Sequence, residues 1–376
     1  MRKTDTLVVG ASISGLATAA CLQNKSIDYI IIEKQSEVAA PWRNHYDRLH
    51  LHTNKRISHL PFKKFAHAIP RYPSRNQVVK YLEEYQMEYG IKPVFDTEAK
   101  SIRKDGCNWI TETDNETFLS EHVVVATGSF CKSRPIDFPG IESFTGSVMH
   151  SSQYTTGQKF KGQKVLVVGF GNSACEIAID LYEQGAMPSM SVRSPVNILP
   201  RDLLGVPILE LSLLLSKLPA RVADMFNMPV TGFLFSDLNK LGLKKMQTGP
   251  FETIVKYGIA PVLDIGTVKH IRQGHISIKK AIDHIDRQTI YFSDGSREDF
   301  DVIVAAIGYY NNCSEIIHVD QSRFQDLTVS VDKQKYFGKD GLYFCGFWIA
   351  PTGQIREISM DAQKIAKDIA IKKACC

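Results

Sequence analysis

The stretch KVLVVGFGNSACE, from Lys164 to Glu176, has the pattern of a phosphate-binding turn between a strand and a helix. The apolar run Val165–Val168 predicts a buried strand. Gly169 and Gly171, with Ala174 in the third position, predict a tight turn that opens a helix. Because glycine has no Cβ, the backbone can turn sharply and approach a pyrophosphate, while the helix N-terminus offers free N–H groups and partial positive charge. We therefore expect a dinucleotide to bind here.

A second turn of this kind stands near the N-terminus, in the stretch TLVVGASISGLA. Gly10, Ser12 and Gly15 follow the GxGxxG spacing, with serine in place of the middle glycine. They lie between a predicted strand, Thr6–Val9, and a predicted helix, Leu16–Gln23. A glycine triplet alone is weak evidence, because a strand–helix unit without a ligand can contain one. The residue at the end of the next strand strengthens the case for a ligand.

The two turns differ in that residue. The predicted strand Tyr29–Ile32 ends in Glu33, which lies 23 residues beyond the first glycine of its turn. The predicted strand Met190–Val192 ends in Arg193, which lies 24 residues beyond the first glycine of its own turn. A carboxylate accepts hydrogen bonds from free ribose hydroxyls, whereas a guanidinium grips a 2′-phosphate that a carboxylate would repel. Arg193 therefore predicts NADPH at the second turn, and Glu33 predicts a dinucleotide with free ribose hydroxyls at the first. FAD is the dinucleotide of that kind that can accept hydride from NADPH.

Two apolar stretches indicate how the domains connect. His122–Gly128 and Val302–Gly308 read as strands that end in a small-residue turn, as expected where the chain leaves one nucleotide domain and later returns to it. We expect an α/β fold with two Rossmann-like domains, the NADPH domain being inserted into a split FAD domain. The expected ranges are 1–157 and 306–376 for the FAD domain and 158–305 for the NADPH domain, with a helical lid at about 202–250.

The composition is that of an ordinary globular protein. The chain has 376 residues, which fits two domains better than one. Hydrophobic residues make up 44% and charged residues 23%, and the formal charge of +5 is spread without a block of like charges. This distribution does not favour nucleic acid as a partner, and it suits anionic small molecules.

Cysteine spacing and hydropathy indicate which classes of protein this chain does not belong to. The eight cysteines include no CxxC pair, which indicates reduced thiols in a cytoplasmic protein and excludes a disulfide reductase that needs a redox pair. The terminal Cys375 and Cys376 lack a CaaX pattern, so a lipid anchor is not favoured. We expect the stretch MRKTDTLVVG to enter a strand directly, and we therefore do not expect a secretion signal. The apolar region Leu203–Phe235 is interrupted by prolines and charges, so we expect a lid or core cover and no transmembrane segment.

The segment FTGSVMHSSQY, Phe144–Tyr154, matches FxGxxxHxxxY, a fingerprint of flavin-containing monooxygenases. Over most of its length the chain resembles the plant YUCCA-type branch of that family. The stretches with this resemblance are WRNHYDRLHLH (Trp42–His52), RYPSRNQVVKYLEEY (Arg71–Tyr85), VVGFGNSACEIAIDL (Val167–Leu181), NILPRDLLG (Asn197–Gly205) and APVLDIGTVKHIRQG (Ala260–Gly274). Two places depart from the family pattern, Ile307 where threonine is usual and the region Trp348–Arg356.

The resemblance implies an enzyme that uses FAD, NADPH and O2 and converts indole-3-pyruvate to indole-3-acetate. Hydride would pass from NADPH to FAD, and the reduced flavin would take up O2 at C4a as a peroxide that survives when water is excluded. With an α-keto acid, the deprotonated peroxide would attack the keto carbon and carbon dioxide would leave. Close relatives oxygenate amines and sulfides, in which the protonated peroxide gives oxygen to a lone pair. An NADPH oxidase and a flavin-bearing redox sensor also remain open, as does a homodimer.

The turns and the resemblance together define the expected site. The residues expected at FAD are Gly10, Ser12, Gly15, Glu33, Ala126, Thr127 and Gly128. The residues expected at NADPH are Gly169, Gly171, Asn172, Ser173 and Arg193. The matching motifs add Trp42, Arg43, Gln77 and Arg201 as cofactor-binding residues, and Gln354, in the region Trp348–Arg356 that departs from the pattern, is expected there as well. The flavin supplies the reactive chemistry, so no Ser/His/Asp triad or carboxylate pair is needed.

Three histidines, His45, His50 and His52, crowd the segment NHYDRLHLHTNK. On an extended strand the last two would share a face, but no acidic or cysteine partner stands at a supporting spacing, so ordinary surface or core histidines are favoured over a metal site. The resemblance offers a third interpretation, in which an asparagine of this loop lies beside the flavin. Spacing selects His52 for that place and residue identity selects Asn54. Both stay catalytic candidates, together with Asn172.

Overall fold

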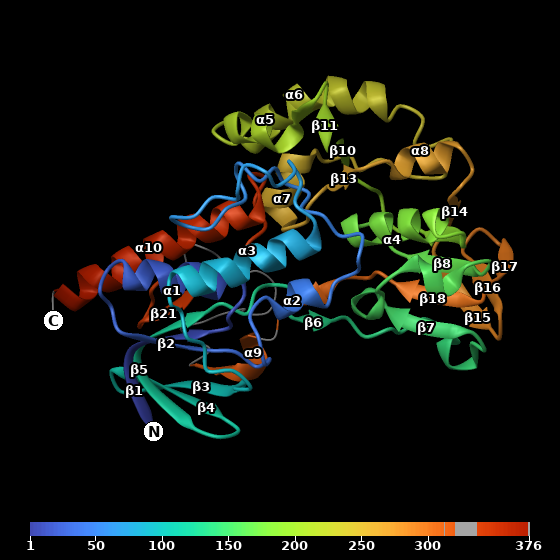
Figure 1. Ribbon diagram of the computed structural model, residues 1–376. Coiled ribbons are helices and arrows are strands. Elements are labelled where there is room, and N and C mark those ends of the chain that lie inside the picture. The colour runs from blue at the N-terminus through green and yellow to red at the C-terminus, as the bar shows by residue number, and fades with distance from the viewer. Residues whose placement is uncertain (312, 320–336, 375–376) are drawn as a thin grey trace. The chain divides into compact units, whose positions relative to one another are not determined.

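A computed structural model describes residues 1–311, 313–319 and 337–374 (Figure 1). Strands and helices alternate through most of this range, so the predicted α/β class is confirmed. The terminal Cys375 and Cys376, considered above as a lipid anchor, lie outside the described residues.

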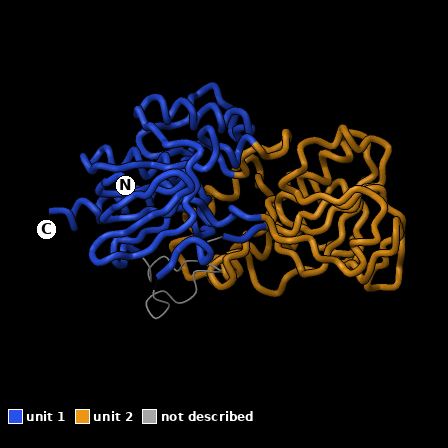
Figure 2. Tube along the Cα trace, turned by 90° about the horizontal axis from the view of Figure 1, so that it is seen from below, with its two compact units in different colours: residues 1–43, 53–132, 309–376 blue, residues 44–52, 133–308 orange. Residues whose placement is uncertain are grey.

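The chain divides into two compact units (Figure 2). Unit 1 contains residues 1–43, 53–132 and 309–376, and unit 2 contains residues 44–52 and 133–308. Each unit contains one of the two glycine turns. The predicted cofactor domains are defined by what they bind and not by compactness, so their boundaries stay a prediction.

The sheet of unit 1 follows the strand order β2-β1-β5-β4-β3-β20, and β21 pairs with β5. β1 is parallel to both of its neighbours, with Thr6 opposite Tyr29 on β2 and His122 on β5. Its residues Leu7 and Val8 are fully buried, as expected for a strand covered on both faces. The strands are β1 (Arg2–Val9), β2 (Tyr29–Ile32), β3 (Ala99–Asp105), β4 (Asn108–Thr113), β5 (Thr117–Val125), β20 (Ile317–His318) and β21 (Leu342–Phe344).

In unit 1, a helix from the N-terminal part of the chain packs against a helix from the C-terminal part. α10, from the C-terminal part, packs on α1, which follows the first glycine turn (Figure 1). α1 is buried along nearly its whole length, which explains its run of small and apolar residues. The helices are α1 (Ile13–Gln23), α2 (Ala40–Arg43), α3 (Arg75–Glu88), α9 (Cys313–Ile316) and α10 (Gln354–Ala374), and two short strands are β6 (Lys132–Ser133) and β19 (Tyr309–Tyr310).

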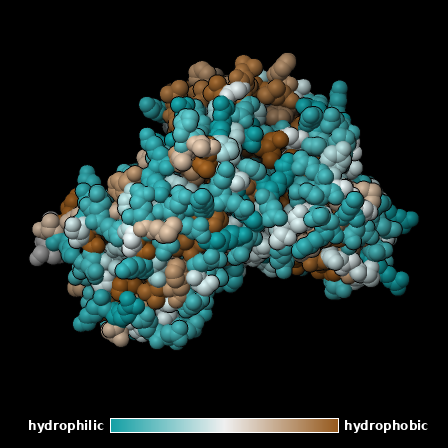
Figure 3. All heavy atoms as spheres, in the orientation of Figure 1, coloured by the Kyte–Doolittle hydropathy of each residue, from teal (hydrophilic) through white to brown (hydrophobic). Residues whose placement is uncertain are grey.

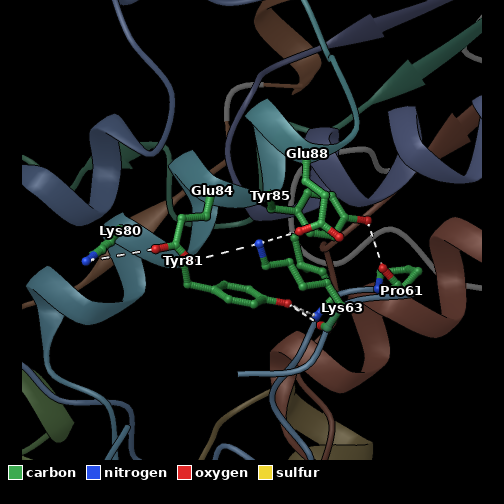
Figure 4. A network of polar contacts seen from close by, with 8 residues as sticks. Pro61, Lys63, Lys80, Tyr81, Glu84, Tyr85 and Glu88 are labelled. Carbon is green, nitrogen blue, oxygen red and sulfur yellow. Dashed lines mark hydrogen bonds and ion pairs between the residues drawn. The ribbon is translucent and has the colours of Figure 1, made fainter. Parts of the chain in front are cut away.

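A network of polar contacts fixes the loop before α3 (Figure 4). The Tyr81 hydroxyl donates to the Lys63 carbonyl oxygen at 2.7 Å, and the Tyr85 hydroxyl donates to the Pro61 carbonyl oxygen at 3.0 Å. Lys63 Nζ also pairs with Glu88 Oε2 at 2.6 Å. Burial raises the pKa of both phenols, so they remain protonated donors. The part of the loop that follows Asn54 is therefore anchored to α3.

Unit 2 contains a parallel sheet with the order β14-β9-β8-β18-β7 and, beside it, an antiparallel β15-β16-β17 sheet. β8 lies between β9 and β18, and Val165–Val167 at its centre are fully buried. The strands are β7 (Ser147–His150), β8 (Lys164–Val168), β9 (Met187–Ser191), β14 (Ser277–Lys279), β15 (Ile282–Asp286), β16 (Thr289–Phe292), β17 (Arg297–Asp299) and β18 (Val302–Ala305). The helices of this part are η1 (Ile141–Ser143), η2 (Ser151–Gln153), η3 (Gly157–Phe160), α4 (Asn172–Glu183) and α8 (Thr267–Arg272).

The segment predicted as a lid is mainly helical and presents apolar side chains to solvent. Figure 3 shows apolar side chains gathered over α5 and α6. In this segment Leu214 is 66% exposed, Phe226 62% and Phe233 84%. A segment that only covers the core would bury its apolar side chains. The inner face of this segment therefore fits the prediction of a core cover, and its outer face does not. The elements are β10 (Ile198–Pro200), β11 (Asp202–Leu203), β12 (Val206–Pro207), α5 (Ile208–Leu215), α6 (Ala220–Leu234), α7 (Pro250–Tyr257) and β13 (Val262–Asp264).

Prolines divide this segment as the sequence predicts, with one exception. Pro207 precedes α5 and Pro219 precedes α6, but α6 continues through Pro229. In the described parts of the chain, no helix combines the length and apolar character that crossing a bilayer requires.

Candidate functional site

The first glycine turn has the geometry of a pyrophosphate cradle. Gly10 has a φ of +105°, and a Cβ there would lie 3.0 Å from the carbonyl oxygen of Ala126. A Cβ on Gly15 would lie 1.8 Å from the Gly10 carbonyl oxygen, so only glycine lets α1 start this close to the turn. The N-cap residue Ser12 makes no side-chain capping bond, which leaves the N-terminal N–H groups of α1 for an anion. The turn fits the diphosphate of a dinucleotide.

Glu33 reaches this turn although 23 residues separate it from Gly10. Its Oε2 accepts a hydrogen bond from the Ala11 N–H at 2.7 Å, and its Oε1 accepts one from the Gln35 N–H at 3.0 Å. The residue is only 8% exposed. The carboxylate thus stands at the end of β2, beside the turn, where a ribose with free hydroxyls would bind.

The strand-end turn Ala126–Gly128 lies directly beside the first glycine turn. The Ala126 N–H donates to the Val9 carbonyl oxygen at 2.9 Å. The Oγ1 atom of Thr127 is buried and has no hydrogen-bond partner among the described residues. A buried hydroxyl without a protein partner is a group that a ligand or a water molecule can satisfy.

The C-terminal part of the chain returns to the same turn. A Cβ on Gly346 would lie 2.2 Å from Ser14 Oγ, so this glycine allows the chain to pass against the start of α1. Gln354 Nε2 donates to the Gly346 carbonyl oxygen at 3.1 Å, and a Cβ on Gly353 would lie 3.3 Å from Thr53 Cγ2. The structure therefore brings Gln354 and the loop before Asn54 to the neighbourhood of the first turn.

The second glycine turn repeats this geometry in unit 2. Gly169 has a φ of +123°, and a Cβ there would lie 2.5 Å from the Ala306 carbonyl oxygen. Gly171 is the N-cap of α4, makes no side-chain capping bond and has open space where its Cβ would be. This turn also fits an approaching phosphate, with Ser173 in the first turn of its helix.

Arg193 lies two residues beyond the end of β9, on the side of the second glycine turn that the sequence predicts. The Gly169 N–H donates to the carbonyl oxygen of Ser191 at 3.0 Å, which ties the turn to the end of β9 two residues before Arg193. The Arg193 side chain is exposed and forms no ion pair within the described ranges. Its guanidinium is available for a 2′-phosphate.

Asn172 and Arg201 both make contacts within unit 2, and those of Asn172 are with backbone atoms. Asn172 Oδ1 accepts from the Leu263 N–H at 2.8 Å, and its Nδ2 donates to the Pro261 carbonyl oxygen at 3.3 Å. Arg201 Nε pairs with Asp202 Oδ2 at 3.1 Å. Asn172 therefore joins the start of α4 to β13.

Two residues of the fingerprint Phe144–Tyr154 contact the segments on either side of the second glycine turn. His150 Nε2 lies 3.1 Å from the carbonyl oxygen of Gly308, where β18 has ended, and burial lowers the pKa of this imidazole. Tyr154 Oη donates to Asp180 Oδ2 on α4 at 2.6 Å, and the pKa of the phenol is raised by burial and by this carboxylate. The histidine and tyrosine of the motif thus hold the parts that flank the glycine turn.

The histidine-rich segment is not the extended strand that the sequence suggested. The chain between α2 and α3 is a loop with turns. His50 is exposed, and its Nδ1 lies 2.7 Å from the Arg48 carbonyl oxygen, while His52 Nε2 pairs with the carboxylate of Glu176 on α4. Within the described chain, no group of three potential ligands could hold a metal.

Glu176 is the main residue that the motif analysis overlooked. Its side chain is only 2% exposed, and it lies one helical turn after Asn172. The available signal is an acid inside the mainly apolar run Ala174–Leu181 of the helix that follows the second glycine turn. Buried carboxylates need partners, and His52 is the partner here.

We expect a Glu176→Ala variant to lose about 1–3 kcal/mol of unfolding free energy, because it leaves the His52 imidazole without its buried acceptor. Urea unfolding measures this loss. The matched control is Glu183→Ala on the same helix, whose ion pair with Arg48 at 2.9 Å is more exposed and contributes about 0–1 kcal/mol. Equal losses in the two variants would contradict a special role for the Glu176 pair.

Four other predicted residues lie in unit 1. Asn54 is 4% exposed, and its Oδ1 accepts from the Arg56 N–H at 3.0 Å. Arg43, next to the half-buried Trp42 on α2, pairs with Glu37 at 3.0 Å and Glu83 at 2.5 Å. Gln77 belongs to the capping box at the start of α3. These bonds of Arg43 and Gln77 hold α2 and α3 in place, and none of them reaches the glycine turn.

The cysteines that the structure describes are free thiols, and Cys21, Cys175, Cys313 and Cys345 among them are buried. Burial raises the pKa of Cys21 to about 12 and raises the pKa of Cys175, on α4, as well. A thiol that stays protonated is a poor nucleophile.

Comparison with known proteins agrees with this geometry. The family described as pyridine nucleotide-disulphide oxidoreductase matches residues 7–199, a range that includes both glycine turns. Indole-3-pyruvate monooxygenase YUCCA1 of Oryza sativa subsp. japonica is 37% identical over 370 residues, which are 96% of this chain and 90% of the relative. Indole-3-pyruvate monooxygenase YUCCA6 of Arabidopsis thaliana is 37% identical over 378 residues, 97% of this chain and 90% of the relative.

Solved structures share the fold at lower identity. A flavin-containing monooxygenase from Stenotrophomonas maltophilia has a TM-score of 0.71 at 18% identity, with all of both chains covered. An open crystal structure of cyclohexanone monooxygenase has a TM-score of 0.73 at 15% identity and covers 100% of this chain and 88% of that one. A bacillithiol disulfide reductase from Staphylococcus aureus has a TM-score of 0.71 at 16% identity, and the match covers 99% of this chain and 100% of that one. The chain therefore belongs to the flavin-dependent monooxygenases, the FAD- and NADPH-using enzymes that include the YUCCA indole-3-pyruvate monooxygenases, as its sequence predicts.

Proposed function

We propose that this monooxygenase catalyses the oxidative decarboxylation of an aryl α-keto acid, with indole-3-pyruvate as substrate and indole-3-acetate as product. The observation that carries the proposal is the match over 96% of the chain to an enzyme named for this substrate. The two glycine turns, one beside Glu33 and one beside Arg193, support the electron path that this reaction needs.

The proposed domain arrangement is an FAD domain made of residues 1–157 and 306–376, with an NADPH domain of residues 158–305 inserted. The return of the C-terminal part to unit 1 supports it, since β21 pairs with β5 and α10 packs on α1. The passage of Gly346 against Ser14 supports the same arrangement, because it places the returning chain at the first turn.

At the first site, the N–H groups of the turn Gly10–Ser12 and of α1 would bind the FAD diphosphate, and Glu33 would accept hydrogen bonds from the ribose. The Thr127 hydroxyl, which has no partner among the described side chains, would donate to the bound cofactor. When bound and reduced by NADPH, the flavin activates O2 for transfer of one oxygen atom.

At the second site, the turn Gly169–Gly171 and the start of α4 would bind the NADPH diphosphate. Arg193 would bind the 2′-phosphate in a fork of charge-assisted hydrogen bonds. Ser173 lies in the first turn of α4, where its hydroxyl can join this contact. Asn172 would act indirectly, since its amide joins β13 to the helix that receives the phosphate.

Of the two candidates for the flavin side, we favour Asn54. It belongs to unit 1, is buried, and follows Thr53, which lies against Gly353 and therefore near Gln354. His52 belongs to unit 2, and Glu176 engages its Nε2. This contact suits a histidine that positions the nucleotide helix better than one that faces the flavin.

The helical segment at about 202–250 would act as a lid. Its exposed apolar face, which includes Leu214, Phe226 and Phe233, can cover an aryl substrate and exclude water from the reacting oxygen.

The purified enzyme is expected to consume one NADPH and one O2 for each indole-3-acetate and each carbon dioxide formed from indole-3-pyruvate. An oxygen electrode, NADPH absorbance and product chromatography measure this balance together. If the enzyme oxygenates amines or sulfides and forms no indole-3-acetate, its substrates are amines or sulfides and the proposed reaction is wrong. Hydrogen peroxide in place of product would identify an NADPH oxidase, and oxygen uptake that no substrate stimulates would favour a redox sensor.

A further inference from the structure

A cavity of about 200 Å³ lies in unit 2, between α6 and the segment that leads into α7. Apolar side chains of Ile198, Met228, Phe235 and Leu238 form part of its wall. None of the residues assigned above to the cofactors or to catalysis lines it. Since an apolar cavity of about 150 Å³ can bind benzene, this cavity has room for a small aromatic molecule.

The wall of the cavity is held in place before any ligand arrives. Asp224, which is 6% exposed, accepts hydrogen bonds from the N–H groups of Phe251 and Glu252, both at 2.9 Å. A Cβ on Gly249 would lie 2.2 Å from Asp224 Cγ, so only glycine permits this packing. The contact joins α6 to the N-terminus of α7, and the cavity between them is therefore preformed.

The charges around the cavity leave an uncompensated cation. The carboxylate of Asp224 lies at the positive end of α7, and Glu252 pairs with Arg221 at 3.2 Å and with Lys256 at 2.5 Å. Lys245 also lines the cavity, is exposed, and forms no ion pair in the described ranges. The lining contains as many carboxylates as cations, and Lys245 is the lining cation that can pair with an anionic group of a ligand.

Asn227 supplies the polar group that a ligand would use. Its side chain is on α6, lines the cavity and is 5% exposed, and its Nδ2 atom is buried without a hydrogen-bond partner in the described chain. A buried amide donor with no acceptor is costly, and in native proteins it usually has a ligand or water as partner.

We propose that this cavity binds a small aromatic carboxylate, whose ring contacts the apolar wall and whose carboxylate accepts from Asn227 Nδ2 near Lys245. The cavity is a second small-molecule site, separate from the two glycine turns. Its position between α6 and α7 means that a bound ligand would stabilise the segment proposed as the lid.

Benzoate, titrated calorimetrically into the FAD-loaded enzyme with NADP⁺ present, tests the proposal. We expect saturable binding that becomes about ten-fold weaker or more in Asn227→Leu, because leucine keeps the volume but removes the donor. The matched control is Asn239→Leu, an exposed asparagine outside the cavity, which should bind as the unmodified enzyme does. The melting temperature of Asn227→Leu should be unchanged or higher, since the unpaired donor is gone.

Indole-3-acetate is titrated in parallel to identify the source of the ligand. Binding tighter than that of benzoate, lost in Asn227→Leu, would assign the cavity to the product; this arm rests on the proposed function. Weaker binding than that of benzoate would assign it to a smaller external carboxylate. Equal benzoate affinity in Asn227→Leu and the unmodified enzyme, or no binding by the folded enzyme, would overturn the proposal. Turnover of indole-3-pyruvate, measured on the same samples, reports on the proposed function independently.

Discussion

A Gly10→Val variant is expected to fold and to be purified without flavin. Gly10 has a φ of +105°, which a β-branched residue adopts only with strain, and a Cβ there would lie 3.0 Å from the Ala126 carbonyl oxygen. The backbone of the turn would have to move away from the place where the diphosphate approaches. The ratio of visible flavin absorbance to protein absorbance measures the loss.

Gly106→Val separates loss of the cofactor from a general loss of stability. Gly106 also has a positive φ, +54°, and lies in the hairpin between β3 and β4 of the same unit, where a Cβ would meet no described atom within 4 Å. This variant also puts valine at a positive φ in the same unit, but away from the turn, and should still contain its full share of flavin. A fully loaded, yellow Gly10→Val protein would show that the first turn does not bind FAD.

The turns could be predicted from sequence because their information is local. The strand Tyr29–Ile32 has the predicted bounds, and β1 and α1 overlap the predicted Thr6–Val9 and Leu16–Gln23. Each turn needs a buried strand, small residues and a helix start within a short stretch, and the polar residue after the next strand follows from the same pattern. Long-range contacts then place Glu33 at the Ala11 N–H.

Residues that depend on distant partners were harder to predict. The segment with His50 and His52 was expected to be extended, but it follows turns because residues such as Asp47 and His52 bond to Thr155 and Glu176, more than 100 positions away. Neither the alternation of side chains nor the local spacing contains that information. The same holds for Tyr154, whose partner Asp180 became apparent only in the fold.

The lid segment shows a second feature that the sequence does not predict, the direction in which its apolar side chains face. Its helices are predicted by prolines and apolar residues, yet sequence alone cannot tell a buried apolar face from an exposed one, because both give the same periodicity. The structure shows that Leu214 and Phe233 are exposed, whereas the polar Asn227 and Asp224 of α6 are buried. This inversion makes the inner face of α6 polar enough to bind a ligand.

An Arg193→Ala variant is expected to bind NADPH about ten- to a hundred-fold more weakly while its flavin content stays normal. A charge-assisted hydrogen bond contributes about 1.5–3 kcal/mol, which corresponds to that loss of affinity. The side chain is exposed, so its removal should not affect folding. Rapid mixing of oxidised enzyme with NADPH, and separately with NADH, gives the affinity of each from the rate of flavin reduction.

The comparison with NADH makes the test specific. NADH lacks the 2′-phosphate, so Arg193→Ala should change its affinity little, and the preference for NADPH should shrink by the factor lost. Arg193→Lys keeps the charge but loses the fork of donors, so its affinity for NADPH should lie between those of Arg193→Ala and the unmodified enzyme. Arg297→Ala, at an exposed arginine on β17 of the same unit, is the matched control and should keep full affinity. Equal use of NADH and NADPH by the unmodified enzyme would contradict the assignment, because a guanidinium at the end of β9 then would not be selecting a phosphate.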